Sequence, residues 1–158
     1  MAATAAEARF RIEYPFLPRD SRIVAVDGGA MGVVRRASQL RWDGSARFLL
    51  YDAATAKGNG ETTDATLRDC TDGETTLLSR ELDGADVAVM VAGSDGGEAA
   101  AIIGRACADR RIMTAGVVLA PAGVHTNDAV VALRPYAMVL IVSSAEDDLI
   151  DLLTALRV

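Results

Sequence analysis

The sequence predicts an α/β protein with a doubly wound, mostly parallel sheet of about five or six strands and helices on both faces. Two observations lead to this fold class. Short apolar runs recur along the chain and are apolar nearly throughout, which is typical of strands covered on both faces. Segments with apolar residues at helical spacing lie between these runs, and such alternation of strands and helices indicates a parallel sheet.

Five apolar runs are expected to form the strands: 22–26, 46–51, 86–92, 112–120 and 137–142. Two helices are expected over 31–41 and 97–109, and a third after Ser143. Ser143 and Glu146 have the spacing of a capping box for that last helix. Its apolar stripe follows at helical spacing: Leu149, Leu152, Leu153 and Leu156.

The chain of 158 residues is long enough to bury one ordinary core, so a single domain is expected. Residues 1–20 are interpreted as an N-terminal arm and residues 21–158 as one α/β domain. The stretch 53–74 is rich in Thr, Gly and Asp, which predicts a long loop or short irregular elements. Loops of that length in compact domains are often functional.

Composition excludes several classes of partner. The net charge of −6 argues against nucleic acid and against an anionic membrane, because both require a cationic surface. No apolar run approaches the ~20 residues that cross a bilayer. The N-terminus has no cationic segment followed by an apolar one, so no secretory signal is predicted. Cys70 and Cys107 are interpreted as reduced, mostly buried thiols of a cytoplasmic protein.

Two glycine-rich turns follow predicted strands, "DGGAMG" (27–32) and "GSDGGE" (93–98). Ligands of open parallel sheets bind beyond the carboxyl ends of the strands, where these turns lie. Glycine allows close backbone approach, and the helix that follows directs free N–H groups outward. The pair predicts an anion or nucleotide site, although tight turns alone also explain glycines. Neither turn matches the dinucleotide or Walker pattern.

With their flanks, these turns resemble the nucleotide-binding half of the tubulin/FtsZ family. "RIVAVDGGAMGVVRRASQL" is similar to the family's first strand, glycine loop and helix. "GADVAVMVAGSDGG" resembles the stretch that leads into its signature loop, and "RRIMTAGVVLAP" the next strand and its proline-bearing turn. "AVVALRPYAMVLIVSSAEDDLIDLL" fits the helix, strand and helix that follow. The resemblance covers about residues 21–156 and implies the Rossmann-like N-terminal domain of that family.

The resemblance also implies which residues bind the nucleotide, GTP or GDP. The glycines of the first turn would line the first phosphate loop: Gly28, Gly29 and Gly32. The glycines of the second turn would form what remains of the signature loop: Gly93, Gly96 and Gly97.

The departures from the family pattern weaken that implication. The family signature reads GGGTGTG, whereas here Gly96-Gly97 is followed by Glu98-Ala99-Ala100. Non-glycine residues occupy glycine positions of the first loop: Asp27, Ala30 and Met31. The chain also ends where the family's long central helix would begin. That helix contributes to the base pocket, and the acidic loop after it completes hydrolysis in the neighbouring subunit. A self-sufficient polymerising GTPase is therefore not implied.

Three carboxylates are expected near the same crevice: Asp27, Asp95 and Glu98. A phosphate ~4 Å from a carboxylate meets about 4 kcal/mol of repulsion at an effective dielectric of about 20. A helix N-terminus contributes only ~0.3–1 kcal/mol, or about 2 when partly buried. Triphosphate binding is therefore expected to be weakened or lost, unless Asp27 and Asp95 recruit Mg²⁺.

Other roles for the carboxylates stay open. Asp95 is at a place where Asp often caps a helix, and Glu98 in a first helical turn is favourable for dipole reasons alone. An amine, or the donor edge of a guanine- or pterin-like ring, would pair naturally with a carboxylate. His125, the only histidine, follows the fourth predicted strand, where either a general base or a solvated side chain is expected. The catalytic candidates are thus Asp95, Glu98 and His125.

Three functions follow from these observations. The favoured one is a reduced tubulin/FtsZ-like domain without appreciable GTP hydrolysis, which acts by self-association, as a homo-oligomer, or through a partner protein. The second is a guanine-nucleotide-binding module that uses the residual glycine turns, with Mg²⁺ or without it. The third is a small-molecule enzyme that uses the acidic strand-end pocket on a cationic or heterocyclic substrate.

Overall fold

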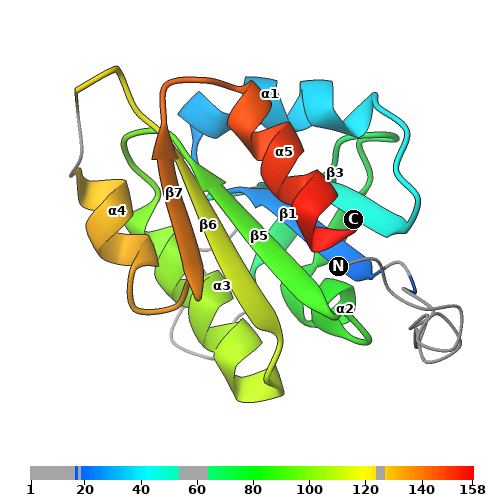
Figure 1. Cartoon of the computed structure of the whole chain (residues 1–158). Helices are drawn as coiled ribbons and strands as arrows, with labels where there is room; N and C mark the ends of the chain where they lie inside the picture. The colour runs from blue at the N-terminus through cyan, green and yellow to red at the C-terminus, as the bar shows by residue number, and fades with distance from the viewer. Residues whose placement is uncertain (1–16, 18, 54–63, 124–126) are drawn as a thin grey trace, which may run out of the picture.

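The computed structural model describes residue 17 and residues 19–53, 64–123 and 127–158. These residues form one seven-stranded sheet with helices on both faces (Figure 1). The strands are β1 (Asp20–Ala25), β2 (Ser45–Tyr51), β3 (Thr66–Asp69), β4 (Thr75–Leu77), β5 (Val87–Ala92), β6 (Met113–Leu119) and β7 (Val139–Ser143). The helices are α1 (Gly28–Ser38), α2 (Leu78–Leu82), α3 (Gly97–Arg110), α4 (Asp128–Leu133) and α5 (Asp147–Leu156).

The sheet has the order β4-β3-β2-β1-β5-β6-β7, and its five strands from β2 to β7 in this order are parallel. The predicted doubly wound, mostly parallel fold class is confirmed, and each of the five predicted strands is present within a few residues of its expected bounds. The chain leaves β1 toward β2 on one side and leaves β5 toward β6 on the other. The switch point of the sheet therefore lies between β1 and β5, where a ligand crevice is expected.

The expected strand count was too low, and the stretch 53–74, expected to be a long loop or short irregular elements, contains a regular strand, with a second one directly after it. Thr66–Asp69 is β3, which pairs antiparallel with β2, and Thr75–Leu77 is β4, which pairs antiparallel with β3. These strands are short and polar ("TLRD", "TTL"), so neither has the apolar run that marks a strand in the sequence. Residues 54–63 lie outside the described residues.

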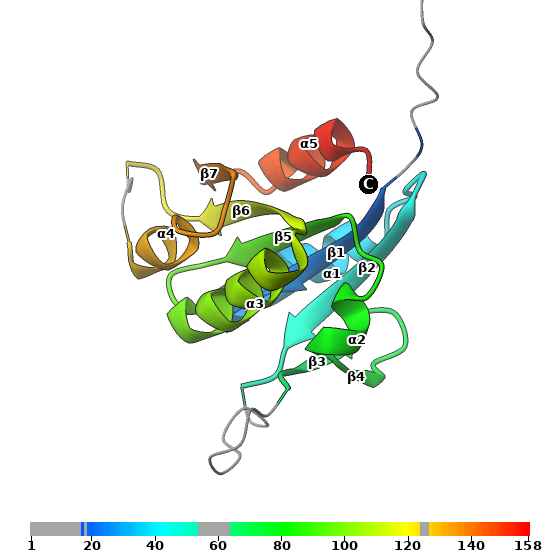
Figure 2. The same ribbon diagram turned by 90° about the horizontal axis from the view of Figure 1, so that it is seen from below.

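The helices cover the two faces of the sheet unequally (Figure 2). Helices α1 and α5 pack on one face, against strand residues such as Ile23, Val89 and Val117. Helices α2, α3 and α4 pack on the other, against Val24 and Met90. Because successive residues of β1 and β5 point to opposite buried faces, β5 is apolar throughout and β1 is apolar from Ile23 to its end.

The expected capping box at the start of α5 is not formed. Ser143 ends β7, where its hydroxyl donates to the carboxylate of Asp148 and accepts the N–H of Ala145 at 2.9 Å. Glu146 forms an ion pair with Arg36 of α1 instead. At the other end of the chain, Asp20 belongs to β1, so the sheet begins one residue before the predicted boundary of the arm. Residues 1–16 lie outside the described residues.

A buried ionic cluster joins the antiparallel strands and α2 to the parallel strands. Arg22 of β1 and Arg47 of β2 lie side by side in the sheet, and the carboxylate of Glu81 in α2 lies 3.4 Å and 3.2 Å from their guanidinium groups. Arg47 also pairs with Asp69 of β3 at 2.7 Å. The hydroxyl of Thr76 in β4 donates to Glu81 at 2.9 Å. One carboxylate of α2 thus contacts three strands.

Replacing Glu81 by Ala is expected to lower the free energy of unfolding by about 3 kcal/mol. The change leaves Arg22 buried with Asp20 as its remaining carboxylate partner, at 2.6 Å. Urea denaturation followed by circular dichroism measures the effect, with the exposed Glu74→Ala as the matched control. Equal stability of the two variants would mean that the cluster does not hold α2 on the sheet.

Candidate functional site

The two glycine turns meet at the switch point between β1 and β5. The N–H of Val26 donates to the carbonyl of Val91 at 2.9 Å, which continues the pairing of the two strands to their ends. A Cβ placed on Gly29 would lie 3.3 Å from the Cα of Gly93, and one on Gly93 would lie 3.1 Å from the Cα of Gly29. The backbones of the two turns are therefore in direct contact.

The side chain of Asp27 lies between the two turns and binds both of them. Its carboxylate accepts the N–H of Ala30 at 2.9 Å, which caps α1. It also accepts the N–H of Gly93 at 2.8 and 3.0 Å and that of Asp95 at 3.1 Å. One half-buried carboxylate thus collects three backbone N–H groups, one from the first turn and two from the second.

This arrangement gives the glycines another role than the one expected from the family. The first three, Gly28, Gly29 and Gly32, lie in the first two turns of α1, which starts earlier than predicted because Asp27 caps it. Gly29 and Gly93 permit the close contact of the two turns. Gly96 begins α3 with φ of 88°, and a Cβ there would lie 2.7 Å from the side chain of Val26. Packing and turn geometry thus explain Gly29, Gly93 and Gly96 without a ligand, whereas a Cβ on Gly28 would meet nothing within 4 Å.

A second polar side chain supports the same turn from the other side. Asn127 caps α4 by accepting the N–H of Val130 at 2.9 Å, and its amide donates to the carbonyl of Gly93 at 3.3 Å. Gly93 therefore has its N–H bound by Asp27 and its carbonyl bound by Asn127. Asn127 is one of the polar residues that follow the fourth predicted strand, and an Asn directly before "DAVVAL" is a typical helix N-cap signal.

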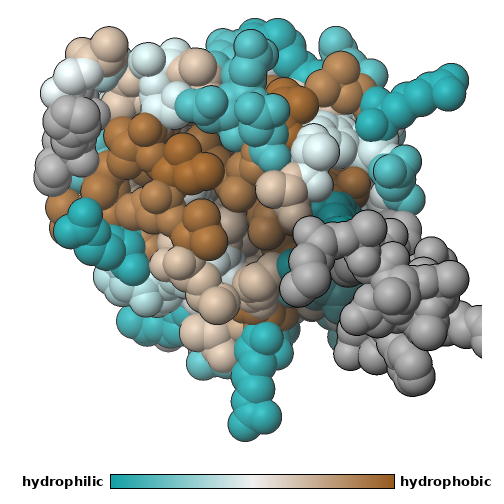
Figure 3. Space-filling view, viewed as in Figure 1, coloured by the Kyte–Doolittle hydropathy of each residue, from teal (hydrophilic) through white to brown (hydrophobic). Residues whose placement is uncertain are grey.

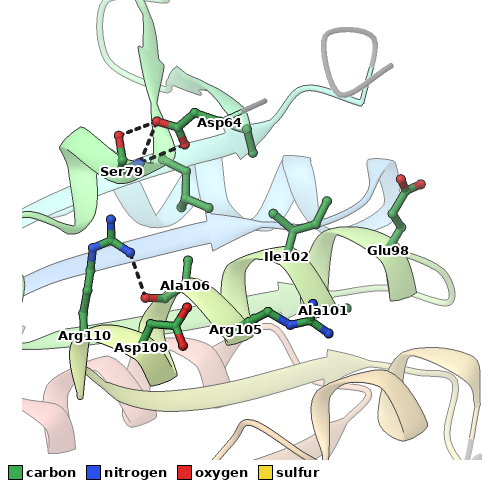
Figure 4. Close-up of a pocket in the computed structure, with 11 residues that line it drawn as sticks. Asp64, Ser79, Glu98, Ala101, Ile102, Arg105, Ala106, Asp109 and Arg110 are labelled. Atoms are coloured by element: carbon green, nitrogen blue, oxygen red, sulfur yellow. Dashed lines mark hydrogen bonds between the residues drawn. The ribbon is translucent and has the colours of Figure 1, made fainter. Parts of the chain in front are cut away.

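The three carboxylates have three different environments instead of one acidic pocket. Asp27 is half-buried among N–H donors. Asp95 is exposed and accepts the N–H of Gly96 at 2.8 Å, and it does not cap α3, whose N-cap residue is Gly96. Glu98 is exposed in the first turn of α3, on the face that looks toward α2 (Figure 4).

The described residues contain no group of three or more His, Cys, Asp or Glu side chains arranged to hold a metal ion. Asp27 and Asp95, the pair considered for Mg²⁺, accept backbone N–H groups as described above. His125, the candidate general base, lies outside the described residues.

Two hollows that described residues line at the carboxyl edge of the sheet are small. One of about 250 Å³ and one of about 290 Å³ share the ends of β6 and β7. Pro121, Ser143 and Ser144 line both of them, and Gly29 and Glu146 line the first. Pockets for small molecules usually measure ~300–1,000 Å³, so each of these hollows falls below that range.

A larger hollow of about 620 Å³ lies between α2 and α3, away from the glycine turns (Figure 4). Its floor is apolar and consists of Ala65, Leu78, Ala101, Ile102 and Ala106. Its rim is charged and consists of Asp64, Glu98, Arg105, Asp109 and Arg110. Asp64 is held by Ser79, whose N–H donates to it at 3.1 Å and whose hydroxyl also donates to it. Arg110 donates to the carbonyl of Ala106 at 3.1 Å.

The hydroxyl of Tyr51 is buried, and no hydrogen-bond partner for it lies among the described residues. Tyr51 ends β2, is 7% exposed and packs in the same cluster as Ala65, Leu78 and Ile102, which line the hollow. Burial raises the pKa of this hydroxyl, and the Glu98 carboxylate raises the pKa further. A buried hydroxyl without a partner costs free energy.

No protein-family model matches this chain, and no curated protein matches its sequence. Across the described ranges, no helix is both long enough and apolar enough to cross a membrane.

The variant Asp27→Ala is expected to lose about 2–4 kcal/mol of unfolding free energy, because it removes a helix cap and the acceptor of two further N–H groups. Chemical denaturation measures the loss. Asp95→Ala, which removes an exposed carboxylate from the same site, serves as the control and should change stability by less than about 0.5 kcal/mol. A loss of similar size in both variants would contradict the role assigned to Asp27.

Proposed function

We propose that this protein is a tubulin/FtsZ-like domain whose nucleotide crevice is filled by its own Asp27 side chain, and that it acts by protein association without appreciable GTP hydrolysis. One observation carries the proposal: the carboxylate of Asp27, just after β1, accepts N–H groups from both glycine turns. Segments that resemble the family follow one another in the family's order over residues 21–156, and this supports the proposed relationship to the family.

The backbone N–H groups at this switch point are the groups that an incoming phosphate would use. Asp27 already binds three of them, within its own chain and at 2.8–3.1 Å. A phosphate would have to displace a charged acceptor whose hydrogen bonds contribute about 1.5–3 kcal/mol each. If the carboxylate stayed nearby, the phosphate would also meet about 4 kcal/mol of repulsion at ~4 Å. The loss of these hydrogen bonds and the charge repulsion both oppose nucleotide binding.

Titration calorimetry with GTP and GDP tests the proposal, each in the presence and absence of Mg²⁺. We expect no binding heat up to millimolar nucleotide, because the phosphate donors are occupied. The variant Asp27→Gly, which restores the family's glycine at this position, should bind more tightly if it folds. Binding of GTP by the unmodified protein in the micromolar range would instead favour the guanine-nucleotide module that uses Gly28, Gly29, Gly96 and Gly97.

A second candidate function is supported by the hollow between α2 and α3, which has the volume of a small-molecule site and an apolar floor. Glu98 lies on its charged rim. A ligand with N–H donors, such as a guanine- or pterin-like ring, would place them against Glu98. This candidate keeps Glu98 as a binding residue but moves the site from the glycine turns to the α2–α3 hollow.

Guanine and pterin serve as probes of that hollow, with binding followed by ligand-observed NMR. We expect Glu98→Gln to weaken binding about tenfold or more, because a charge-assisted hydrogen bond is lost. Asp95→Asn is the matched control and should bind as the unmodified protein does. Loss of binding in Asp95→Asn alone would return the site to the glycine turns, and the absence of binding to either probe would contradict this candidate.

A further inference from the structure

The strand β7 (Val139–Ser143) is one open edge of the sheet. The other edge, β4, is only three residues long, whereas β7 has five residues, "VLIVS". An edge strand presents unpaired backbone N–H and C=O groups, and proteins usually protect it with charge, proline or a bulge. The stretch 137–145 contains neither a charged residue nor a proline, so the β7 edge lacks both of these protections.

The surface around this edge is apolar (Figure 3). Met138 is 76% exposed, Val131 of α4 63% and Val139 46%. We call these three residues together with Ile141 the β7 edge patch. Helix α5 lies over the middle strands and leaves β7 uncovered on that face (Figures 1 and 2). Exposed apolar side chains that gather at one place mark an interaction surface more often than scattered ones do.

We propose that β7 pairs antiparallel with β7 of a second copy of this chain, across a two-fold axis at Ile141, so that the two sheets become continuous. The proposal rests on the self-association part of the proposed function and names the surface that performs it. A two-fold dimer brings the same patch of each copy together, so the patch must complement itself.

The sequence of β7 meets this requirement, since its apolar pattern is nearly symmetric about Ile141. In the antiparallel pair, Ile141 lies opposite its own copy, Leu140 opposite Val142, and Val139 opposite Ser143. Residues opposite each other in an antiparallel pair lie on the same face of the sheet and interact. Ile141 thus meets a β-branched residue on the axis, and Leu140 and Val142 form an apolar pair on each side of it, so apolar side chains face each other at the centre of the pairing.

Electrostatics also favour a second copy at this place. Two copies with a net charge of −6 repel each other, so they approach most easily where neither surface carries charge. The nine residues 137–145 form such a stretch. The side chain of Leu140 holds β7 on the sheet, because it packs closely over Gly116 of β6. A Cβ on Gly116 would lie 2.8 Å from the Leu140 side chain.

A cysteine placed on the axis tests the pairing. In the proposed dimer, the Cβ atoms of Ile141 and its copy lie about 4.5–5.5 Å apart, close enough for a disulfide after small adjustments. We expect Ile141→Cys to give a cross-linked dimer on mild oxidation, seen on a non-reducing gel. Met138→Cys is the control: Met138 is more exposed, but its copy lies about 20 Å away across the axis. The unmodified protein, oxidised in the same way, shows how much cross-linking arises from Cys70 and Cys107.

Sedimentation equilibrium at micromolar concentration supplies the second readout. We expect the unmodified protein to be a dimer and Val139→Lys to raise the dissociation constant about tenfold or more, because a lysine on an edge strand opposes its pairing with another chain. Leu40→Lys, an equally exposed apolar position far from β7, should leave the dimer intact.

The outcomes distinguish a failure of the β7 pairing from a failure of self-association as such. A monomeric unmodified protein overturns both the β7 pairing and the self-association on which it rests. A dimer that survives Val139→Lys, or that fails to cross-link through Ile141→Cys, overturns only the β7 pairing and points to another interface or partner surface. Cross-linking through Met138→Cys as well would contradict the register at Ile141.

Discussion

The carboxylate of Asp27 is the contact on which the centre of this structure depends. It follows β1, caps α1 and binds the turn that follows β5, so it joins the ends of the two strands between which the sheet changes direction. Helices α1 and α3 leave this point on opposite faces, and Asn127 adds the start of α4 to the same turn through Gly93. Because three N–H groups share one charged acceptor, removing that acceptor would leave donors of several elements without a partner.

The same contact changes the function that a sheet of this kind usually supports. An open parallel sheet offers its switch point to a ligand, commonly an anion held by helix N-termini. Here the carboxylate of Asp27 accepts the N–H groups at that place, and the two hollows at the ends of β6 and β7 are small. The two surfaces on which the proposals rest lie apart from it: the α2–α3 hollow with Glu98 on its rim, and the uncharged edge of β7. Both are reached from solvent without disturbing Asp27.

The parts of this fold that the sequence predicts are those with a strong local signal. β1, β5 and β6 are buried on both faces, so their continuous apolar runs identify them. β3 and β4 have no such run. Polar residues can stand in these strands because the fold supplies partners for them from other elements, as Arg47 of β2 does for Asp69 of β3. For the carboxylates too, only the local part was predictable. The sequence shows that they lie near the glycine turns, but it does not show which groups their side chains contact. Asp27 turns inward to backbone donors, and Glu98 faces the hollow beside α2.

What the sequence by itself determined is the α/β class, the parallel central strands and the presence of acidic residues where a phosphate site is expected, because periodicity, glycine and charge are local properties. The tertiary structure decided what these residues do. Whether Asp27 repels a ligand or replaces it depends on the positions of N–H groups that lie 66 and 68 residues away in the chain. Likewise, "VLIVS" reads as one more buried strand, and only its place at the end of the sheet order leaves its backbone groups unpaired. Neither the hydrogen bonds of Asp27 nor the edge position of β7 can be predicted from the sequence, because both depend on segments that are far apart in the chain and meet only in the folded protein.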